Sequence, residues 1–334
     1  MQDQPPKTQS PKPKTDGLPA RIHRITSTLG PRPFSQYLLR GEMMMLVDTG
    51  IDSTPADVIL PWFAENGLTI AELNLVLNSH ADVDHCGGNY AIRQAAPNAA
   101  FLAGDFDTRW IENRDLMLAE RYGWYAAHGP EVDYDAETRE FFKSELGPDI
   151  TIDRHLFGGE QIDLGGGLVV EVLALPGHSE GHVGLWEPNS RTAIVIDAVL
   201  GAGLLNMDGV VIHPPPYFAA NKYEATIAKV RDLNPARLLT AHYEVIEGDQ
   251  VVAFLDKSQD FVDRARAAVA RELEERGEVS LAELLAELGP ELGPFTSFAN
   301  ELAGPLLDHL IELVGAGEAY EVADADPLRW RWNG

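Results

Sequence analysis

Four side chains that can hold a metal ion lie close together in the first third of the chain. They are two histidines and two aspartates within six residues, namely His80, Asp82, Asp84 and His85. They follow the apolar run 73–77 and precede the glycine pair Gly87 and Gly88. Carboxylates packed this closely repel one another unless a cation lies between them, and imidazole together with carboxylate suits zinc, iron or manganese. The spacing therefore predicts a metal site at the end of a buried strand.

Three further residues of ligand type stand at the ends of strand-like runs later in the chain. They are His178 in the segment 175–178, Asp197 at the end of 194–197, and His242 at the end of 238–242. Each of them alone is a weak signal. Because all of them occupy strand ends, as His80 does, we expect them to complete the same metal site.

The segments around these residues alternate between strand and helix patterns. Residues 37–47 predict a hairpin, 56–66 a helix that ends at Gly67, 73–77 a buried strand, 90–96 a helix and 99–102 a strand. Residues 152–200 have the pattern of successive strands separated by glycine-rich and Asn-Ser turns. Together they predict a layered α/β domain, which we place at 20–255.

Residues 105–155 interrupt this alternation with helical spacing, many charges and several aromatic residues, including Trp110 and Trp124. One interpretation is a helical insertion whose aromatic side chains pack into the core. The other is a lid that walls a substrate pocket, because long insertions often carry function. The sequence leaves both interpretations open.

The pattern changes again at residues 256–334, which predict three amphipathic helices and a terminal hairpin, with Ser280 and Glu283 as a capping box. This order resembles a winged-helix module. Many such modules bind DNA, but residues 263–334 carry 6 basic and 15 acidic side chains, which disfavours that role. We expect this module to pack against the rest of the chain or to form a homodimer contact.

Composition excludes several classes of partner. The 334 residues include 26 Lys and Arg against 52 Asp and Glu, and the net charge of −26 argues against nucleic acid and anionic membranes. No apolar run approaches the ~20 residues of a membrane-spanning helix. The single cysteine, Cys86, excludes an intramolecular disulfide and fits a reducing compartment. With a polar, Pro-rich segment at 1–19 that predicts a disordered leader, we expect a cytoplasmic protein.

The metal-ligand pattern resembles that of the metallo-β-lactamase superfamily, a four-layer αββα hydrolase fold that includes glyoxalase II and lactonases. The resemblance covers roughly residues 22–250, and Asp48 matches the family's first, structural motif. It implies two divalent metal ions. The first would be held by His80, Asp82 and His178, the second by Asp84, His85 and His242, with Asp197 bridging them. His182 also falls in a family-like Gly-His-x-x-Gly-His segment, and we place it beside the site or in the core.

Asp82 departs from the family pattern, which most often has histidine at this position. An additional carboxylate lowers the charge of the site and favours harder metals, so iron or manganese compete with zinc, which we still expect. The flavodiiron branch of the superfamily has an acid at the equivalent place. A di-iron redox or dioxygenase-type member, or a metal-binding member without turnover, is therefore an alternative, although residues 256–334 are too short for a flavodoxin domain.

The resemblance implies a hydrolase in which a metal-bridging hydroxide attacks the carbonyl of an ester, thioester or lactone. Asp84 would orient the hydroxide and pass a proton to the leaving group. The acidic surface disfavours a phosphodiesterase or nuclease-type member, which remains a second alternative, and favours a small, neutral or weakly charged substrate. The candidate substrate contacts are Trp110, Trp124, His213 and Tyr217.

Overall fold

Two six-stranded sheets form the centre of the molecule. The computed structural model describes residues 18–334, so all but the last two residues of the predicted disordered leader lie outside the described residues. The first sheet has the order β1 (Ile22–Leu29), β2 (Arg32–Arg40), β3 (Met44–Val47), β4 (Leu75–Asn78), β5 (Ala100–Gly104), β6 (Arg154–Leu156). The second has the order β14 (Ile246–Glu247), β13 (Arg237–Leu239), β10 (Thr192–Ile194), β9 (Val183–Glu187), β8 (Val169–Ala174), β7 (Gln161–Asp163). The predicted hairpin is β2 and β3, with Arg40 opposite Met44.

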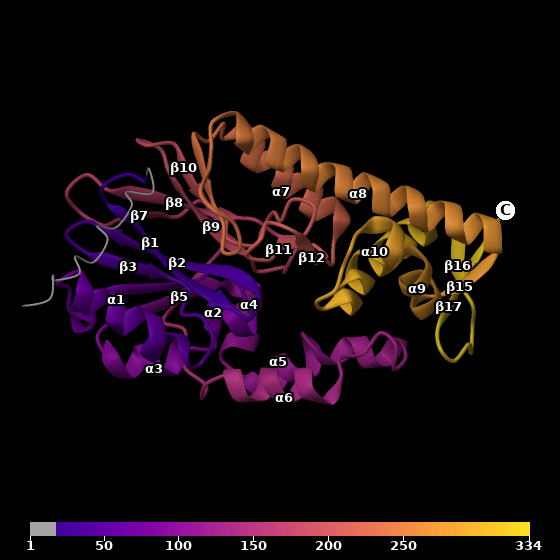
Figure 1. Ribbon diagram of the computed structural model, residues 1–334, viewed down its shortest axis with the longest axis horizontal. Helices are drawn as coiled ribbons and strands as arrows, with labels where there is room; N and C mark the ends of the chain where they lie inside the picture. The colour runs from indigo at the N-terminus through magenta and orange to yellow at the C-terminus, as the bar shows by residue number, and fades with distance from the viewer. Residues whose placement is uncertain (1–17) are drawn as a thin grey trace, which may run out of the picture.

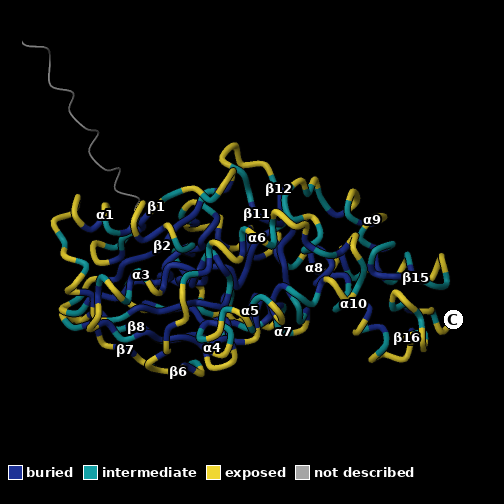
Figure 2. The backbone as a smooth tube through the Cα atoms, turned by 90° about the horizontal axis from the view of Figure 1, so that it is seen from below, coloured by how far each residue is buried: buried dark blue, intermediate teal, exposed yellow. Residues whose placement is uncertain are grey.

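The two sheets pack face to face. Leu39 and Leu77 of the first sheet and Val172 and Leu185 of the second belong to one buried apolar cluster. Helices cover the outer faces: α1 (Leu60–Glu65), after a π-helical turn at Pro55–Ile59, and α3 (Asn89–Ala95) on the first sheet, and α7 (Ala220–Asp232) on the second (Figure 1). Figure 2 shows the buried backbone running through the middle of this sandwich. The predicted αββα architecture is confirmed.

Residues 105–153 form a helical excursion between neighbouring strands of the first sheet. Its helices are α4 (Asp105–Ile111), α5 (Arg114–Glu120), a 3₁₀ segment at Gly123–His128, and α6 (Ala136–Glu145). The strands on either side pair in parallel, with Leu102 of β5 opposite Arg154 of β6. The predicted helical insertion is therefore present, and it lies along the edge of the molecule below the C-terminal helices in Figure 1.

The C-terminal part begins on a helix that it shares with the sandwich. Helix α8 (Asp249–Arg276) has 28 residues and runs from the second sheet to the far end of the molecule (Figure 1). The domain boundary predicted between residues 255 and 256 falls inside this helix, and the division into two domains stays a prediction. Its buried face continues across that point, from Phe254 and Leu255 to Phe261 and Val262, without a helix-breaking residue.

Two α-helices, a 3₁₀ turn and a small sheet complete the C-terminal part. They are α9 (Leu281–Leu292), a 3₁₀ turn at Ala299–Leu302, α10 (Ala303–Ala316), and strands β15 (Glu278–Ser280), β17 (Arg329–Trp332) and β16 (Ala319–Glu321), in that sheet order. The capping box of Ser280 and Glu283 at the start of α9 is present. The winged-helix likeness stays a prediction. Among the described residues, no helix is both long and apolar enough to cross a membrane.

Candidate metal centre

The predicted ligands meet at one end of the sandwich. Ligand atoms of His80, His178 and Asp197 lie within 4.8 Å of one another, and the same holds for Asp84, His85 and His242. Asp197 Oδ2 is 3.2 Å from His242 Nε2 and 3.5 Å from His85 Nε2, so this carboxylate touches both groups. In a tetrahedral zinc site with bonds near 2.1 Å, neighbouring ligand atoms are about 3.4 Å apart. The spacing of the donor atoms therefore fits two metal ions.

The four histidines are oriented in the same way, with Nδ1 held by a neighbour and Nε2 directed into the site. The Nδ1 partners are Ser79 Oγ for His80 (2.9 Å), Asp48 Oδ2 for His85 (2.9 Å), Pro216 O for His178 (2.7 Å) and Pro33 O for His242 (3.2 Å). Such partners fix the ring orientation of metal-binding histidines. The buried Nε2 atoms of His80 and His85 and Oδ1 of Asp197 have no hydrogen-bond partner in the described chain, as expected for atoms that bind a cation.

The charge balance of the site also favours cations. Burial lowers the pKa of His85, but the carboxylates of Asp84, Asp197 and Asp48 outweigh burial and raise it well above its ordinary value. Without a metal, these anions therefore draw a proton onto the imidazole. A histidine must lose this proton before it can bind a metal ion. Metal binding at His85 therefore replaces the single positive charge of the proton by the double charge of a divalent ion.

Two further aspartates hold the ligand loops in place. Asp48, with a positive φ of 63°, accepts hydrogen bonds from the Ser79 backbone N–H at 2.7 Å and the Ser79 hydroxyl at 2.8 Å. Asp107 accepts from Ala81 N at 2.9 Å, Ser179 Oγ at 2.6 Å and Gly181 N at 2.8 Å. It thus joins the loop of His80 to that of His178. Asp107 was not predicted as a site residue, because it stands in an insertion without any recognisable ligand spacing.

Asp82 lies beside the first ligand group but is also bound by the insertion. Its Oδ2 is 3.0 Å from His178 Nε2 and 3.3 Å from His80 Nε2. Arg121 donates hydrogen bonds to both carboxylate oxygens, from Nε to Oδ1 at 2.8 Å and from Nη2 to Oδ2 at 2.9 Å. The Tyr122 hydroxyl also donates to Oδ1, at 3.1 Å. Burial raises the pKa of Asp82, but the Arg121 guanidinium together with the hydrogen bonds to His178 and His80 outweighs burial and holds the pKa well below its usual range. Asp82 as a metal ligand stays a prediction.

His182 stacks on His80, with ring centroids 4.7 Å apart and an interplanar angle of 19°. Burial, followed by the neighbouring rings of His80 and His178, lowers its pKa well below the ordinary value, which keeps the ring neutral. His182 belongs to neither ligand group. It lies where we expected it, packed beside the site.

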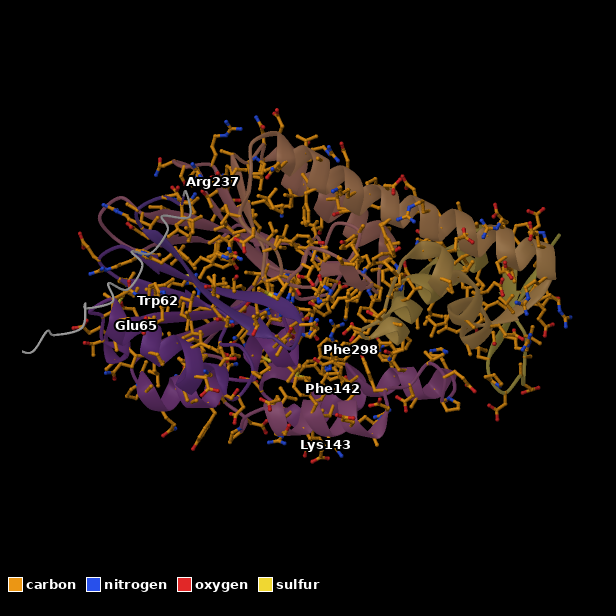
Figure 3. All side chains as sticks on the ribbon, in the orientation of Figure 1. Trp62, Glu65, Phe142, Lys143, Arg237 and Phe298 are labelled. Atoms are coloured by element: carbon orange, nitrogen blue, oxygen red, sulfur yellow. The ribbon has the colours of Figure 1, made fainter. Side chains whose placement is uncertain are left out.

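A pocket opens onto the metal ligands, and the sandwich, the insertion and the C-terminal part all contribute to its walls. The insertion contributes Tyr122, Phe141 and Phe142, and the C-terminal part contributes Phe298 and Glu301. The rings of Phe142 and Phe298 face each other with centroids 6.3 Å apart, as Figure 3 shows for the two labelled side chains. Phe298 has a positive φ of 48°, an uncommon conformation for a bulky residue. The insertion therefore forms part of the pocket wall, as the lid interpretation of residues 105–155 required.

The predicted substrate contacts are distributed over three places. His213 lines the pocket, where its Nε2 is 3.1 Å from Glu301 Oε2 and its Nδ1 is 2.7 Å from Pro214 O. Trp110 and Trp124 instead line a separate groove, together with Arg121. The structure thus brings one of these three residues to the metal pocket, and no sequence pattern distinguished it from the others.

The prediction for Tyr217 is wrong, because the side chain is fully buried away from the pocket. Its hydroxyl bonds His309 Nε2 of α10 at 2.8 Å, and its ring stacks on Tyr223 of α7. The proline-rich stretch before it does reach the pocket through Pro216. The next residue turns inward because an aromatic ring is stabilised by burial between packed helices.

Tyr217→Phe should therefore change stability and leave the pocket unaffected. The substitution deprives the buried Nε2 of His309 of its partner, although Nδ1 keeps its bond to Glu312. We therefore expect the free energy of unfolding to fall by about 1–3 kcal/mol. Chemical denaturation measures this loss, and Tyr320→Phe, at an exposed position, is the matched control. A changed KM with unchanged stability would return Tyr217 to the substrate pocket.

Comparison with known proteins agrees with this geometry. The profile of the metallo-beta-lactamase superfamily matches residues 29–242. Beta-lactamase-like protein 2 homolog of Caenorhabditis elegans is 22% identical over 259 residues, covering 77% of this chain and 73% of that protein. Probable metallo-hydrolase YflN of Bacillus subtilis is 35% identical over 78 residues, covering 21% of this chain and 30% of that protein.

Among solved structures, the metallo-beta-lactamase family protein TTHA1429 from Thermus thermophilus has a similar fold, with a TM-score of 0.71 at 18% identity. The match covers 94% of this chain and 99% of that one, so it includes the C-terminal part. The profile match spans most of the chain and contains every predicted metal ligand. The chain therefore belongs to the metallo-beta-lactamase superfamily and is one of its metallo-hydrolases.

Proposed function

We propose that this protein hydrolyses the carbonyl group of an ester, thioester or lactone in a small molecule, using two divalent metal ions. The observation that carries the proposal is the pair of ligand groups, joined at Asp197, beside an apolar-walled pocket. His80, His178 and Asp197, with Asp82 beside them, would hold one ion, and Asp84, His85 and His242 the other. Bound there, the ions would supply Lewis acidity toward a carbonyl and toward water.

The side chains around the ligands support such a reaction. Asp84 lines the pocket with its side chain 14% exposed, and its oxygens lie 3.8 Å from His85 Nε2 and 3.7 Å from His242 Nε2. A carboxylate placed there can orient a water molecule, take its proton and pass it to the leaving group. The rings of Phe141, Phe142 and Phe298 line the same pocket and would limit the access of bulk water to that proton.

Zinc is the metal we propose, because Arg121 offsets the negative charge that Asp82 adds to the site. Without Arg121, the extra carboxylate would favour a harder ion such as iron or manganese. With the guanidinium bound to both of its oxygens, the local charge is that of a site with one carboxylate fewer. This weakens the case for the redox or dioxygenase alternative, which rested on the acid at this position.

Removal of metal tests the proposal. We expect the purified protein to hydrolyse at least one member of a panel of chromogenic esters, thioesters and lactones, to lose the activity on chelation, and to regain it with zinc. Asp84→Asn is the inactive reference. Turnover of a phosphodiester alone would favour the nuclease-type alternative, and oxygen consumption by an iron-loaded form would favour the redox alternative. No metal-dependent turnover of any carbonyl compound would contradict the proposal.

A further inference from the structure

One positively charged side chain in the metal pocket lacks a partner. Arg32, at the start of β2, is only 9% exposed and lines the pocket together with Asp84 and His242. Its guanidinium makes no hydrogen bond or ion pair with any residue in the described range 18–334. The contact that it does make is with the face of the Phe298 ring, with Cζ 5.5 Å from the centroid. A buried guanidinium without an anion is costly, which indicates that a ligand supplies one.

The carboxylates nearest the pocket already have other partners. Asp82 is bound by Arg121, and Glu301 accepts from the Tyr134 hydroxyl at 2.8 Å and lies 3.1 Å from His213 Nε2. The remaining acids that line it, Asp84 and Asp197, face the histidine Nε2 atoms of the metal groups. Arg32 is the only Arg or Lys among the lining residues of the described chain. Its charge is therefore available to a molecule in the pocket.

The two residues that follow Arg32 in the chain contact His85 and His242 of the second ligand group. The carbonyl of the next residue, Pro33, bonds His242 Nδ1 at 3.2 Å. The ring of Phe34 packs on His85 and His242, with centroids 5.6 and 5.3 Å away. One small molecule can thus place a carbonyl at the metal ligands and an anionic group at Arg32.

We propose that the substrate carries a carboxylate that binds Arg32, on an apolar body that lies between the metal ligands and Phe298. This rests on the proposed hydrolase function and specifies its substrate class. A guanidinium pairs with a carboxylate through two parallel hydrogen bonds. The walls around it are apolar, formed by Leu29, Leu200, Leu204 and the phenylalanine rings. Arg32 is a single cation among several carboxylates, so it can balance the charge of a monoanion but not that of a phosphate dianion. The expected substrate therefore carries one negative charge and is not neutral.

The kinetic test uses two esters that differ in one charge. Mono-4-nitrophenyl adipate ends in a carboxylate, and its methyl ester is the neutral partner. With the zinc-loaded protein we expect a KM about tenfold or more lower for the carboxylate. Arg32→Gln should remove this preference by raising the KM of the carboxylate ester, and Arg32→Lys should retain part of it. Arg40→Gln, exposed at the far end of the same strand, should behave as the wild type.

A binding measurement tests Arg32 independently of turnover. By calorimetry, 6-phenylhexanoate should bind the wild-type protein about tenfold or more tightly than 6-phenylhexanamide, and Arg32→Gln should abolish the difference. A carboxylate preference that survives Arg32→Gln would show that the metal ions hold the carboxylate and would overturn the proposal. An equal affinity for acid and amide in the wild type would overturn it as well. Turnover of neither ester, with the binding preference intact, would count against the hydrolase function alone.

Discussion

Replacing Asp197 by alanine is expected to lower kcat/KM on the order of a thousandfold or more and to leave at most one metal ion per chain. Asp197 shares the first ligand group with His80 and His178, and its Oδ2 also lies within 3.5 Å of His85 and His242 Nε2. Loss of this one side chain removes a donor from both groups. The freed histidines would keep their Nδ1 partners, so the fold should persist.

Elemental analysis and steady-state kinetics on the same preparation measure these two effects together. Asp197→Asn, which keeps the shape and removes the charge, should fall between the wild type and the alanine variant. Asp232→Ala, at an exposed position at the end of α7, is the control and should retain both metal and activity. An alanine variant with full metal content and undiminished turnover would show that Asp197 is not shared between the ions.

Arg121→Gln is expected to destabilise the metal-free protein by about 3–5 kcal/mol, because it leaves the buried Asp82 carboxylate without its cation. The Arg121 and Asp82 side chains are 7% and 15% exposed, so solvent replaces little of the lost interaction. The same change removes the guanidinium that offsets the Asp82 carboxylate, so the first ligand group becomes more negative. We therefore expect the variant to shift its metal preference from zinc toward manganese or iron.

A double-mutant cycle separates this pair from general loss of packing. If the damage comes from the uncompensated carboxylate, Arg121→Gln combined with Asp82→Asn should be more stable than Arg121→Gln alone. Arg154→Gln, at an exposed position on β6, controls for the loss of a surface arginine. A double variant less stable than either single one, with unchanged metal preference, would mean that Arg121 acts only through its packing on Phe218.

The metal ligands could be predicted from the sequence because each lies at the end of a short segment with a recognisable strand pattern. His80, Asp197 and His242 each follow a short apolar run, and the family resemblance joins them into one site. Arg121 could not be predicted in the same way. It lies 39 residues from Asp82 in the chain, and no local pattern relates a helix of the insertion to the loop after β4. Only the tertiary packing brings the two together.

The same reason explains the residues that the sequence placed wrongly or missed. Phe298 and Glu301 reach the pocket from the C-terminal part, which was expected only to pack or to dimerise. Tyr217 and His213 both flank the proline-rich stretch, yet one is buried against α10 and the other faces the pocket. The direction of a side chain in an irregular loop depends on what packs around it, so spacing alone could not separate these two.

The metal content of the full chain tests the central claim most directly. The protein, stripped by chelation, reconstituted with zinc and dialysed, should retain about two equivalents per chain by elemental analysis, because the ligand atoms form two groups joined at Asp197. Parallel samples with manganese and iron show whether another ion fills the site better. Retention of well under one equivalent of zinc, manganese and iron alike would contradict the account.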